Sequence, residues 1–233
     1  MADGKPAVAV IIPAKDEERR ILHVLLAACE SRFATEIIVV DDGSCDDTAL
    51  VAAKVPGVKV IKLPHNLGKG GAMAAGVKAC TAQVIAFVDA DLAGLHGEHI
   101  DKIIRPILNS ECEMCVGVFR GGKTWSDSAQ KIAPYLSGQR ALRRELFESI
   151  AGIAGMRMGV EVALNEAAKR RRARIVYTSL SGVSNCHKEQ KLGFGKGMKE
   201  RTKMYVEIAQ TYVKQKRQNR PLKRSKPKRR PWV

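Results

Sequence analysis

Runs rich in valine and isoleucine recur along the first half of the chain, and each one ends at polar residues. The runs are AVAVIIPA (7–14), EIIVVDD (36–42), VKVIKLP (58–64), QVIAFVDAD (83–91) and CEMCVGVFR (112–120). Continuous apolar strands are typical of a parallel sheet that is buried on both faces, whereas a half-exposed sheet shows strict alternation. Each run therefore predicts a strand of a mostly parallel sheet.

Stretches with apolar residues at helical spacing separate these strands. They predict helices over about 16–31, 47–55, 70–80 and 98–108. Strands that alternate with helices indicate a doubly wound α/β fold, in which helices flank both faces of the sheet. After Arg120 the pattern changes. There we expect further helices, a glycine-rich turn region, one more strand and a long helix over 196–214.

Length and composition favour a single globular domain. The chain has 233 residues, of which 45% are hydrophobic and 27% are charged, and this is enough for one sizeable core. We assign the domain to residues 1–213, with a first half over 1–95 and a second over 96–213. The apolar runs are shorter than the eighteen or so residues that cross a bilayer. The six cysteines lie mostly in apolar segments, as reduced core residues of a cytoplasmic protein do.

The net charge of +16 is distributed unevenly along the chain. Residues 214–233 carry ten Lys or Arg and no acidic residue. Self-repulsion and prolines predict that this basic tail is largely disordered. Because basic segments are attracted to anionic lipids, we expect that the tail could place the protein at the periphery of a membrane.

Polar residues follow each predicted strand, at the sheet edge where α/β proteins bind ligands. Asp89 and Asp91 follow the fourth strand. In an extended segment they project to the same side, and two close carboxylates repel each other unless a cation lies between them. A divalent ion such as Mg²⁺ or Mn²⁺ is the natural cation for oxygen ligands. The alternative is an aspartate that caps the next helix, beside a solvated neighbour.

The stretch NLGKGGAMAAG (66–76) places several glycines where a loop enters a helix. Backbone amides at such a position can approach an anion closely, which makes Gly68 and Lys69 candidates for phosphate binding. The alternative is that the glycines allow tight packing of the helix.

Four motifs together resemble a known family. In this order and spacing, VIIPAKDEERRI, EIIVVDDGSCDDT, NLGKGGAMAAG and FVDADL resemble the nucleotide-sugar half of family 2 glycosyltransferases, which have the GT-A fold. The resemblance covers about the first 95 residues. It implies that Asp91 is the aspartate of a D-x-D element that binds Mg²⁺ or Mn²⁺. The donor-binding residues that we assign are Pro13, Ala14, Glu17, Asp42, Gly68, Lys69 and Asp89.

The second half is similar to glucosyl-3-phosphoglycerate synthases and related retaining enzymes, through LSGQRALRRELF, GVEVALNEA and a late histidine. The resemblance implies that His187 completes the metal site with Asp91. Arg140 would lie on the acceptor side, where its planar fork can pair with an anion. Glu161 is the candidate carboxylate near the sugar, and Asp127 is the alternative base. The anomeric outcome stays open.

These features predict a metal-dependent glycosyltransferase of the hexosyltransferase type. It would move a sugar from a nucleoside diphosphate sugar, expected to be UDP-linked, to an acceptor hydroxyl or phosphate. Asp91, Glu161 and Arg140 form the predicted catalytic set, and the ion would neutralise charge on the departing diphosphate.

Three alternative functions stay open. One is a polyprenyl-phosphate sugar transferase at the membrane surface, and another is a sugar-phosphate nucleotidyltransferase. The third is a basic nucleic-acid-binding protein, although the scarcity of aromatic residues argues against it. The expected partners are therefore a nucleotide sugar, an acceptor, an anionic membrane surface and a second copy of the chain, but not a nucleic acid.

Overall fold

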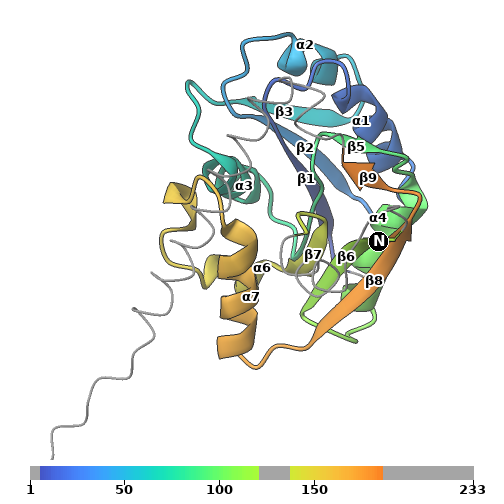
Figure 1. Ribbon diagram of the computed structural model, residues 1–233, viewed down its shortest axis with the longest axis vertical. Coiled ribbons are helices and arrows are strands. Elements are labelled where there is room, and N and C mark those ends of the chain that lie inside the picture. Colours follow the sequence, from blue (N-terminus) through green and yellow to red (C-terminus); the bar gives the residue numbers. More distant parts are fainter. Residues whose placement is uncertain (1–5, 121–136, 186–233) are drawn as a thin grey trace, which may run out of the picture.

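The computed structural model describes residues 6–120 and 137–185 (Figure 1). Asp127, His187, the expected helix over 196–214 and the basic tail over 214–233 lie outside these ranges. Both described ranges contribute strands to one sheet.

The centre of the fold is a seven-stranded sheet with the order β3-β2-β1-β4-β7-β6-β8. Strands β1 to β4 pair in parallel, as do β6 and β8, and only β7 runs antiparallel to its neighbours. The strands are β1 (Val8–Ala14), β2 (Glu36–Asp41), β3 (Val58–Lys62), β4 (Val84–Phe87), β6 (Met114–Arg120), β7 (Arg140–Arg143) and β8 (Ile175–Ser181). The predicted α/β class and its mostly parallel sheet are confirmed.

Helices cover both faces of the sheet (Figure 1). Strand β1 shows why, because Val8, Val10 and Ile12 point into one apolar cluster while Ala9 and Ile11 point into the other. The first cluster includes residues of α1 (Ile21–Cys29), α2 (Thr48–Ala53) and α4 (Gly97–Leu108). The second includes residues of α3 (Lys69–Lys78), α6 (Arg144–Glu148), η1 (Ile153–Gly155) and α7 (Val160–Arg170).

The four predicted helices are confirmed, with bounds that differ at one or both ends. The largest difference is at α1, which begins at Ile21 and not at Asp16. Asp16 has a positive φ of 55°, a backbone conformation that a helix does not allow. The chain turns instead at Glu17, whose carbonyl accepts hydrogen bonds from the amides of Arg20 and Ile21.

The expectation of a single strand after Arg120 was wrong. Besides β8, the structure contains β7 in the middle of the main sheet and a short strand, β9 (Ser184–Asn185). Strand β7 has only four residues, with arginine at both ends, so it lacks the apolar run that marks the other strands. It is a strand because its backbone pairs with β4 on one side and β6 on the other. The local sequence does not show this pairing.

A two-stranded sheet lies beside the main one. Strand β5 (Leu92–Ala93) pairs antiparallel with β9, and Leu92 lies opposite Asn185. Because β5 directly follows Asp91, the end of the second described range comes close to the D-x-D element. In residues 6–120 and 137–185, no helix has the length and apolar character needed to cross a bilayer.

Candidate active site

Three of the predicted site residues meet where the parallel strands end. The Lys69 ammonium Nζ lies 2.7 Å from Asp89 Oδ1 and 2.6 Å from Glu161 Oε1. The three residues come from the start of α3, the segment after β4 and the first turn of α7. Their side chains are only 26%, 22% and 13% exposed, respectively. We call these three residues the charged cluster.

The charged cluster shifts the ionisation of its members. Burial opposes the charge of Lys69, but the Asp89 and Glu161 carboxylates outweigh it and raise the pKa of Lys69 above its ordinary value. Burial also opposes the charge of Asp89. The Lys69 ammonium, a hydrogen bond from Gln139 and the Arg140 charge nevertheless hold the pKa of Asp89 below its usual range. Lys69 and Asp89 are therefore an ion pair at neutral pH.

Both oxygens of Asp89 are hydrogen-bonded. Oδ1 accepts from Lys69, and Oδ2 accepts from Gln139 Nε2 at 2.8 Å. Gln139 is 1% exposed. The backbone of Gly138 also packs closely against Asp89 and Lys69. A Cβ atom at this position would lie 2.3 Å from Asp89 Oδ2 and 2.7 Å from Lys69 Nζ. Sequence reasoning missed the contact of Gly138 and Gln139 with Asp89, for which the polar GQ before the RAL of β7 is the sequence signal.

The D-x-D element does not continue strand β4. The strand ends at Phe87, and Ala90 and Asp91 form a turn, so the alternation that we assumed for Asp89 and Asp91 does not apply. Asp89 faces Lys69, Ala90 is buried in the core, and Asp91 is half-buried.

Asp91 fits a divalent ion in its chemistry, since carboxylate oxygen is a ligand that Mg²⁺ and Mn²⁺ prefer. Within the described ranges, no group of three or more His, Cys, Asp or Glu is arranged to hold a metal ion. His187, the other predicted ligand, lies outside those ranges.

The start of α3 differs from our expectation of amides that face an anion. Each of its first backbone amides already donates to an acceptor within the protein. The pairs are Gly68 N with Asp42 Oδ2 at 2.9 Å, Lys69 N with Arg157 O at 3.0 Å and Gly70 N with Met156 O at 2.8 Å. The prediction that Gly68 offers its amide to a phosphate is therefore corrected.

The glycines serve close packing of α3 instead. A Cβ atom at Gly70 would lie 2.3 Å from the carbonyl oxygens of both Ile153 and Met156. Gly68 has a φ of 83°, which favours glycine, and its missing Cβ would lie 2.5 Å from Arg157 Cα. In Figure 1 the segment around η1 accordingly lies side by side with α3.

Arg140 also differs from its predicted role. Its side chain is fully buried, and Nη2 and Nε donate to the carbonyl of Ser137 at 2.6 and 3.0 Å. Nη1 donates to the carbonyl of Glu161 at 3.3 Å and to Asn165 Oδ1 at 3.1 Å. Burial lowers the pKa of Arg140, against the charges of Glu161 and Asp89. The Arg140 guanidinium thus connects Ser137 to residues of α7 by hydrogen bonds. The expectation that Arg140 faces an acceptor is therefore corrected.

The remaining predicted donor residues line the ends of β1 and β2. Asp42 is 5% exposed, and its carboxylate accepts from the amides of Leu67 at 2.6 Å and Gly68 at 2.9 Å. Glu17 is 7% exposed, and its amide donates to Thr48 Oγ1 at 2.8 Å. Pro13 is half-buried and Ala14 is buried at the end of β1.

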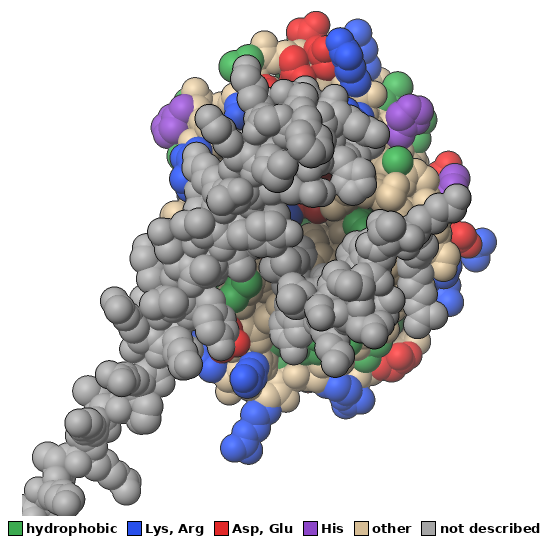
Figure 2. Space-filling model, in the orientation of Figure 1, with side chains coloured by type: hydrophobic (Ala, Val, Ile, Leu, Met, Phe, Trp, Pro, Cys, Tyr) green, Lys and Arg blue, Asp and Glu red, His purple; other side chains and the backbone are tan. Residues whose placement is uncertain are grey.

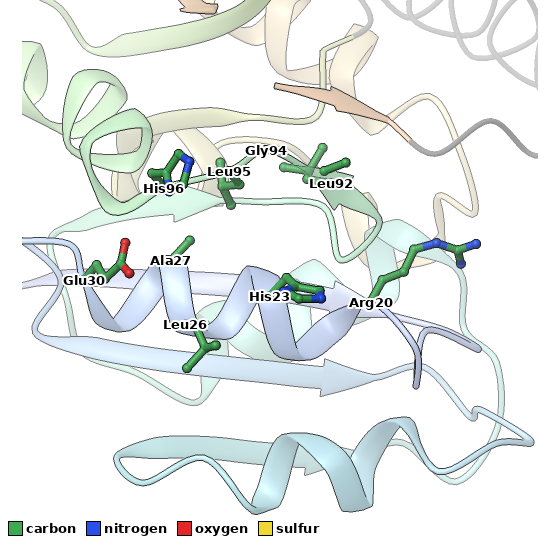
Figure 3. A pocket seen from close by; sticks show the side chains of 10 residues that line it. Arg20, His23, Leu26, Ala27, Glu30, Leu92, Gly94, Leu95 and His96 are labelled. Carbon is green, nitrogen blue, oxygen red and sulfur yellow. The ribbon is translucent and has the colours of Figure 1, made fainter. Parts of the chain in front are cut away.

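A cavity of about 500 Å³ lies away from the charged cluster, between α1 and the segment that follows Asp91 (Figure 3). Ala27 of α1 points toward Leu95 across it, whereas Leu26 points the other way (Figure 3). Its lining includes none of the predicted site residues. The candidate active site is therefore the sheet edge with the charged cluster.

This is an α/β protein, as its sheet order and the helices on both faces show. Acidic residues follow β2 and β4 at the carboxyl ends of the strands, where such proteins bind ligands. The profile of the family described as "Glycosyl transferase family 2" matches residues 9–167. The chain therefore belongs to glycosyl transferase family 2, as its motifs indicated.

Solved structures agree with this family. Glucosyl-3-phosphoglycerate synthase from Mycobacterium tuberculosis, crystallised with phosphoglyceric acid, is 26% identical with a TM-score of 0.65, over 78% of this chain and 72% of that chain. A complex of the same enzyme with Mn²⁺, UDP and phosphoglyceric acid reaches a TM-score of 0.73 at 23% identity, over 94% of this chain and 80% of that chain. These similarities confirm the GT-A fold and the resemblance of the second half.

A curated relative matches a shorter part. The 4,4'-diaponeurosporenoate glycosyltransferase of Staphylococcus aureus is 36% identical over 103 residues, which are 42% of this chain. The match spans only 27% of the length of that relative.

Proposed function

We propose that the protein is a metal-dependent glycosyltransferase that moves a sugar from a UDP-sugar to an acceptor hydroxyl or phosphate. Membership of glycosyl transferase family 2 supports this reaction class. A complex of the 26% identical Mycobacterium tuberculosis enzyme contains Mn²⁺ and UDP-glucose, which supports the donor and the ion. The observation that carries the proposal is the charged cluster at the carboxyl edge of the sheet.

Asp91 and His187 would hold the metal ion. Strand β9 supports this pairing, because its last residue, Asn185, lies opposite Leu92, the neighbour of Asp91. His187 follows Asn185 by two residues in the sequence. When bound, the ion would supply positive charge to the diphosphate as it leaves.

The side chains of the charged cluster would act on the sugar and the departing group. Lys69 carries the positive charge nearest to Asp89 and Glu161 and would stabilise the negative charge that develops on the diphosphate. Glu161 would accept a hydrogen bond from a hydroxyl of the sugar or of the acceptor. Arg140 would act on Glu161 indirectly, since it binds the backbone carbonyl of that residue.

Pro13, Ala14, Glu17 and Asp42 would form the wall of the nucleotide site. They lie at or just beyond the ends of β1 and β2, the position at which open α/β sheets bind nucleotides. Asp42 is held by the amides of Leu67 and Gly68. The wall would therefore be rigid before the donor arrives, which lowers the entropic cost of binding.

Turnover of the donor tests the reaction class. We expect slow release of UDP when the protein is incubated with a UDP-sugar and Mn²⁺, and loss of this release in Asp91→Asn. Asp47→Asn is the matched control, because Asp47 is exposed at the start of α2 and makes no side-chain cap hydrogen bond. Turnover that depends on pyrophosphate would instead indicate a nucleotidyltransferase and would refute the proposal.

The charge distribution bears on the nucleic-acid alternative. Around the rim of the face in Figure 2, basic and acidic side chains of the described residues are interspersed. Polyanion binding favours clustered basic residues, and these visible side chains do not form such a cluster. The expected membrane contact, the second copy of the chain and the cytoplasmic location stay predictions.

A further inference from the structure

Arg157 is an exposed arginine that reaches across from the second half of the chain to the loop before α3. Its Nη2 donates to Asn66 Oδ1 at 3.0 Å, and its Nη1 lies 3.4 Å from the carbonyl oxygen of Asn66. The two residues are 91 positions apart. An exposed arginine side chain loses considerable conformational entropy when it is held in one geometry, so this contact has a cost that its bonds must offset.

The Asn66 side chain connects Arg157 to the loop before α3 through hydrogen bonds. Asn66 Oδ1 also accepts a hydrogen bond from Gly68 N at 2.9 Å. The same amide donates to Asp42 Oδ2, and Leu67 N donates to Asp42 Oδ1. The loop 66–68 is therefore held on one side by Asp42, at the end of β2, and on the other by Arg157.

The backbone of Arg157 reinforces this arrangement. Its carbonyl accepts a hydrogen bond from Lys69 N at 3.0 Å, and its Cα fills the space beside Gly68. Four residues further along the chain, Glu161 pairs with the Lys69 ammonium. The segment 156–161 thus contacts Lys69 at both its backbone and its side chain.

We propose that Arg157 is a positioning residue for the donor nucleotide: through Asn66 it fixes the loop 66–68 and, with it, Asp42 in the wall of the nucleotide site. This inference rests on the proposed function, because it assumes that the wall at Asp42 binds the donor. The Arg157 side chain bonds Asn66, and the contact of Arg157 with Lys69 is made by its backbone carbonyl, which a side-chain substitution retains. Loss of the side chain should therefore affect binding of the donor more than the chemical step.

The test is the binding of UDP in the presence of Mn²⁺, measured by calorimetry on the full chain. We expect Arg157→Ala to weaken UDP binding roughly tenfold, the equivalent of one hydrogen bond from a charged group. The KM for the UDP-sugar should rise by a similar factor while kcat stays within about twofold. Arg157→Lys retains a donor and should recover part of the loss.

Two further variants sharpen the result. Asn66→Ala should weaken UDP binding as Arg157→Ala does, and the double variant should be no worse than either single one, because both remove the same contact. Arg171→Ala is the matched control, since Arg171 is exposed at the end of α7 and far along that helix from Glu161. It should bind UDP like the unaltered protein.

Amide hydrogen exchange gives a readout that does not need the donor. We expect the amides of residues 67–70 to exchange faster in Arg157→Ala than in the Arg171→Ala control. Unchanged exchange and unchanged UDP affinity in Arg157→Ala would overturn the inference, as would additive losses in the double variant. If the unaltered protein fails to bind UDP with Mn²⁺, the proposed function fails and the inference falls with it.

Discussion

Asp42 and Asp89 occupy similar places and are held in different ways. Each follows a parallel strand at the same edge of the sheet, and each has both carboxylate oxygens hydrogen-bonded. The donors to Asp42 are two backbone amides of the loop before α3. The donors to Asp89 are the side chains of Lys69 and Gln139.

The type of donor gives the two aspartates different roles: Asp42 holds a loop in place, and Asp89 belongs to a group of charged side chains. Backbone amides do not titrate, and their positions are set by the fold, so Asp42 is fixed once its loop is formed. A lysine ammonium can move and carries a full charge, so the environment of Asp89 depends on Lys69. Changes at Asp42 should therefore affect loop geometry, whereas changes around Asp89 should affect stability through electrostatics.

The largest effect is expected for Lys69→Met. The substitution removes the cation between Asp89 and Glu161 and leaves two carboxylates facing each other in a largely buried site. Removing one partner of such a group should lower the free energy of unfolding by about 3 kcal/mol, as measured by urea denaturation. Lys54→Met, at an exposed lysine after α2, should change it by less than about 0.5 kcal/mol. Equal losses in the two variants would contradict the role of the charged cluster.

A smaller loss is expected for Asp42→Ala. Leu67 N would lose its acceptor, while Gly68 N would keep Asn66 Oδ1. An amide that loses its acceptor in this part-buried contact costs about 2 kcal/mol. Asp42→Asn keeps one carbonyl oxygen as an acceptor and should lose about half as much. Denaturation curves of both variants measure the two losses of unfolding free energy. A larger loss in Asp42→Asn than in Asp42→Ala would show that charge, and not hydrogen bonding, holds the loop.

Gly138→Ala should cost about 1.5 kcal/mol, because its new Cβ atom would clash with Asp89 Oδ2 and Lys69 Nζ. Gly155→Ala is the matched control. A Cβ at Gly155 would meet no atom within 4 Å, and its stability should be close to that of the unaltered protein. Thermal unfolding of the two variants makes the comparison, and a stable Gly138→Ala would show that the charged cluster can move aside.

The smallest effect is on the pH dependence of stability. Because the pKa of Asp89 is held below its usual range, Asp89 contributes stability that is present above its unfolded pKa, about 3.9. That contribution is lost as pH falls through the lower folded value. The free energy of unfolding should therefore decline below about pH 4 in the unaltered protein. This part of the decline should be absent in Lys69→Met, and an identical decline would contradict the pairing.

The sequence predicts those parts of the fold that depend on local patterns. Buried parallel strands require continuous apolar runs, so β1, β2, β4 and β6 are visible in the sequence. The edge strand β3 has no buried residue and is visible through its Val and Ile residues instead. Strand β7 is not visible, since four residues flanked by arginines become a strand only between β4 and β6. Helix α1 was extended too far because an amphipathic pattern does not reveal the positive φ at Asp16.

The site shows the same limit. Residue types identified Lys69, Asp89 and Glu161, and the fold brings them together. Gly68 and Lys69 were candidates for phosphate binding, with close packing of the glycines as the alternative. A local motif cannot decide between them, because it does not show that carbonyl oxygens of Met156 and Arg157, from a distant segment, accept from the amides of Gly70 and Lys69. Arg140 was expected to face an anion because its planar guanidinium can pair with one, but its side chain is fully buried. Its partners in α7 are 21 and 25 residues away in the sequence.

The central claim is that this sheet edge binds a nucleoside diphosphate through a metal ion at Asp91. Calorimetric titration of UDP into the unaltered protein and into Asp91→Asn, each with and without Mn²⁺, tests it most directly. The account predicts that Mn²⁺ strengthens UDP binding to the unaltered protein and that this strengthening is lost in Asp91→Asn. An equal response to Mn²⁺ in both proteins would contradict it.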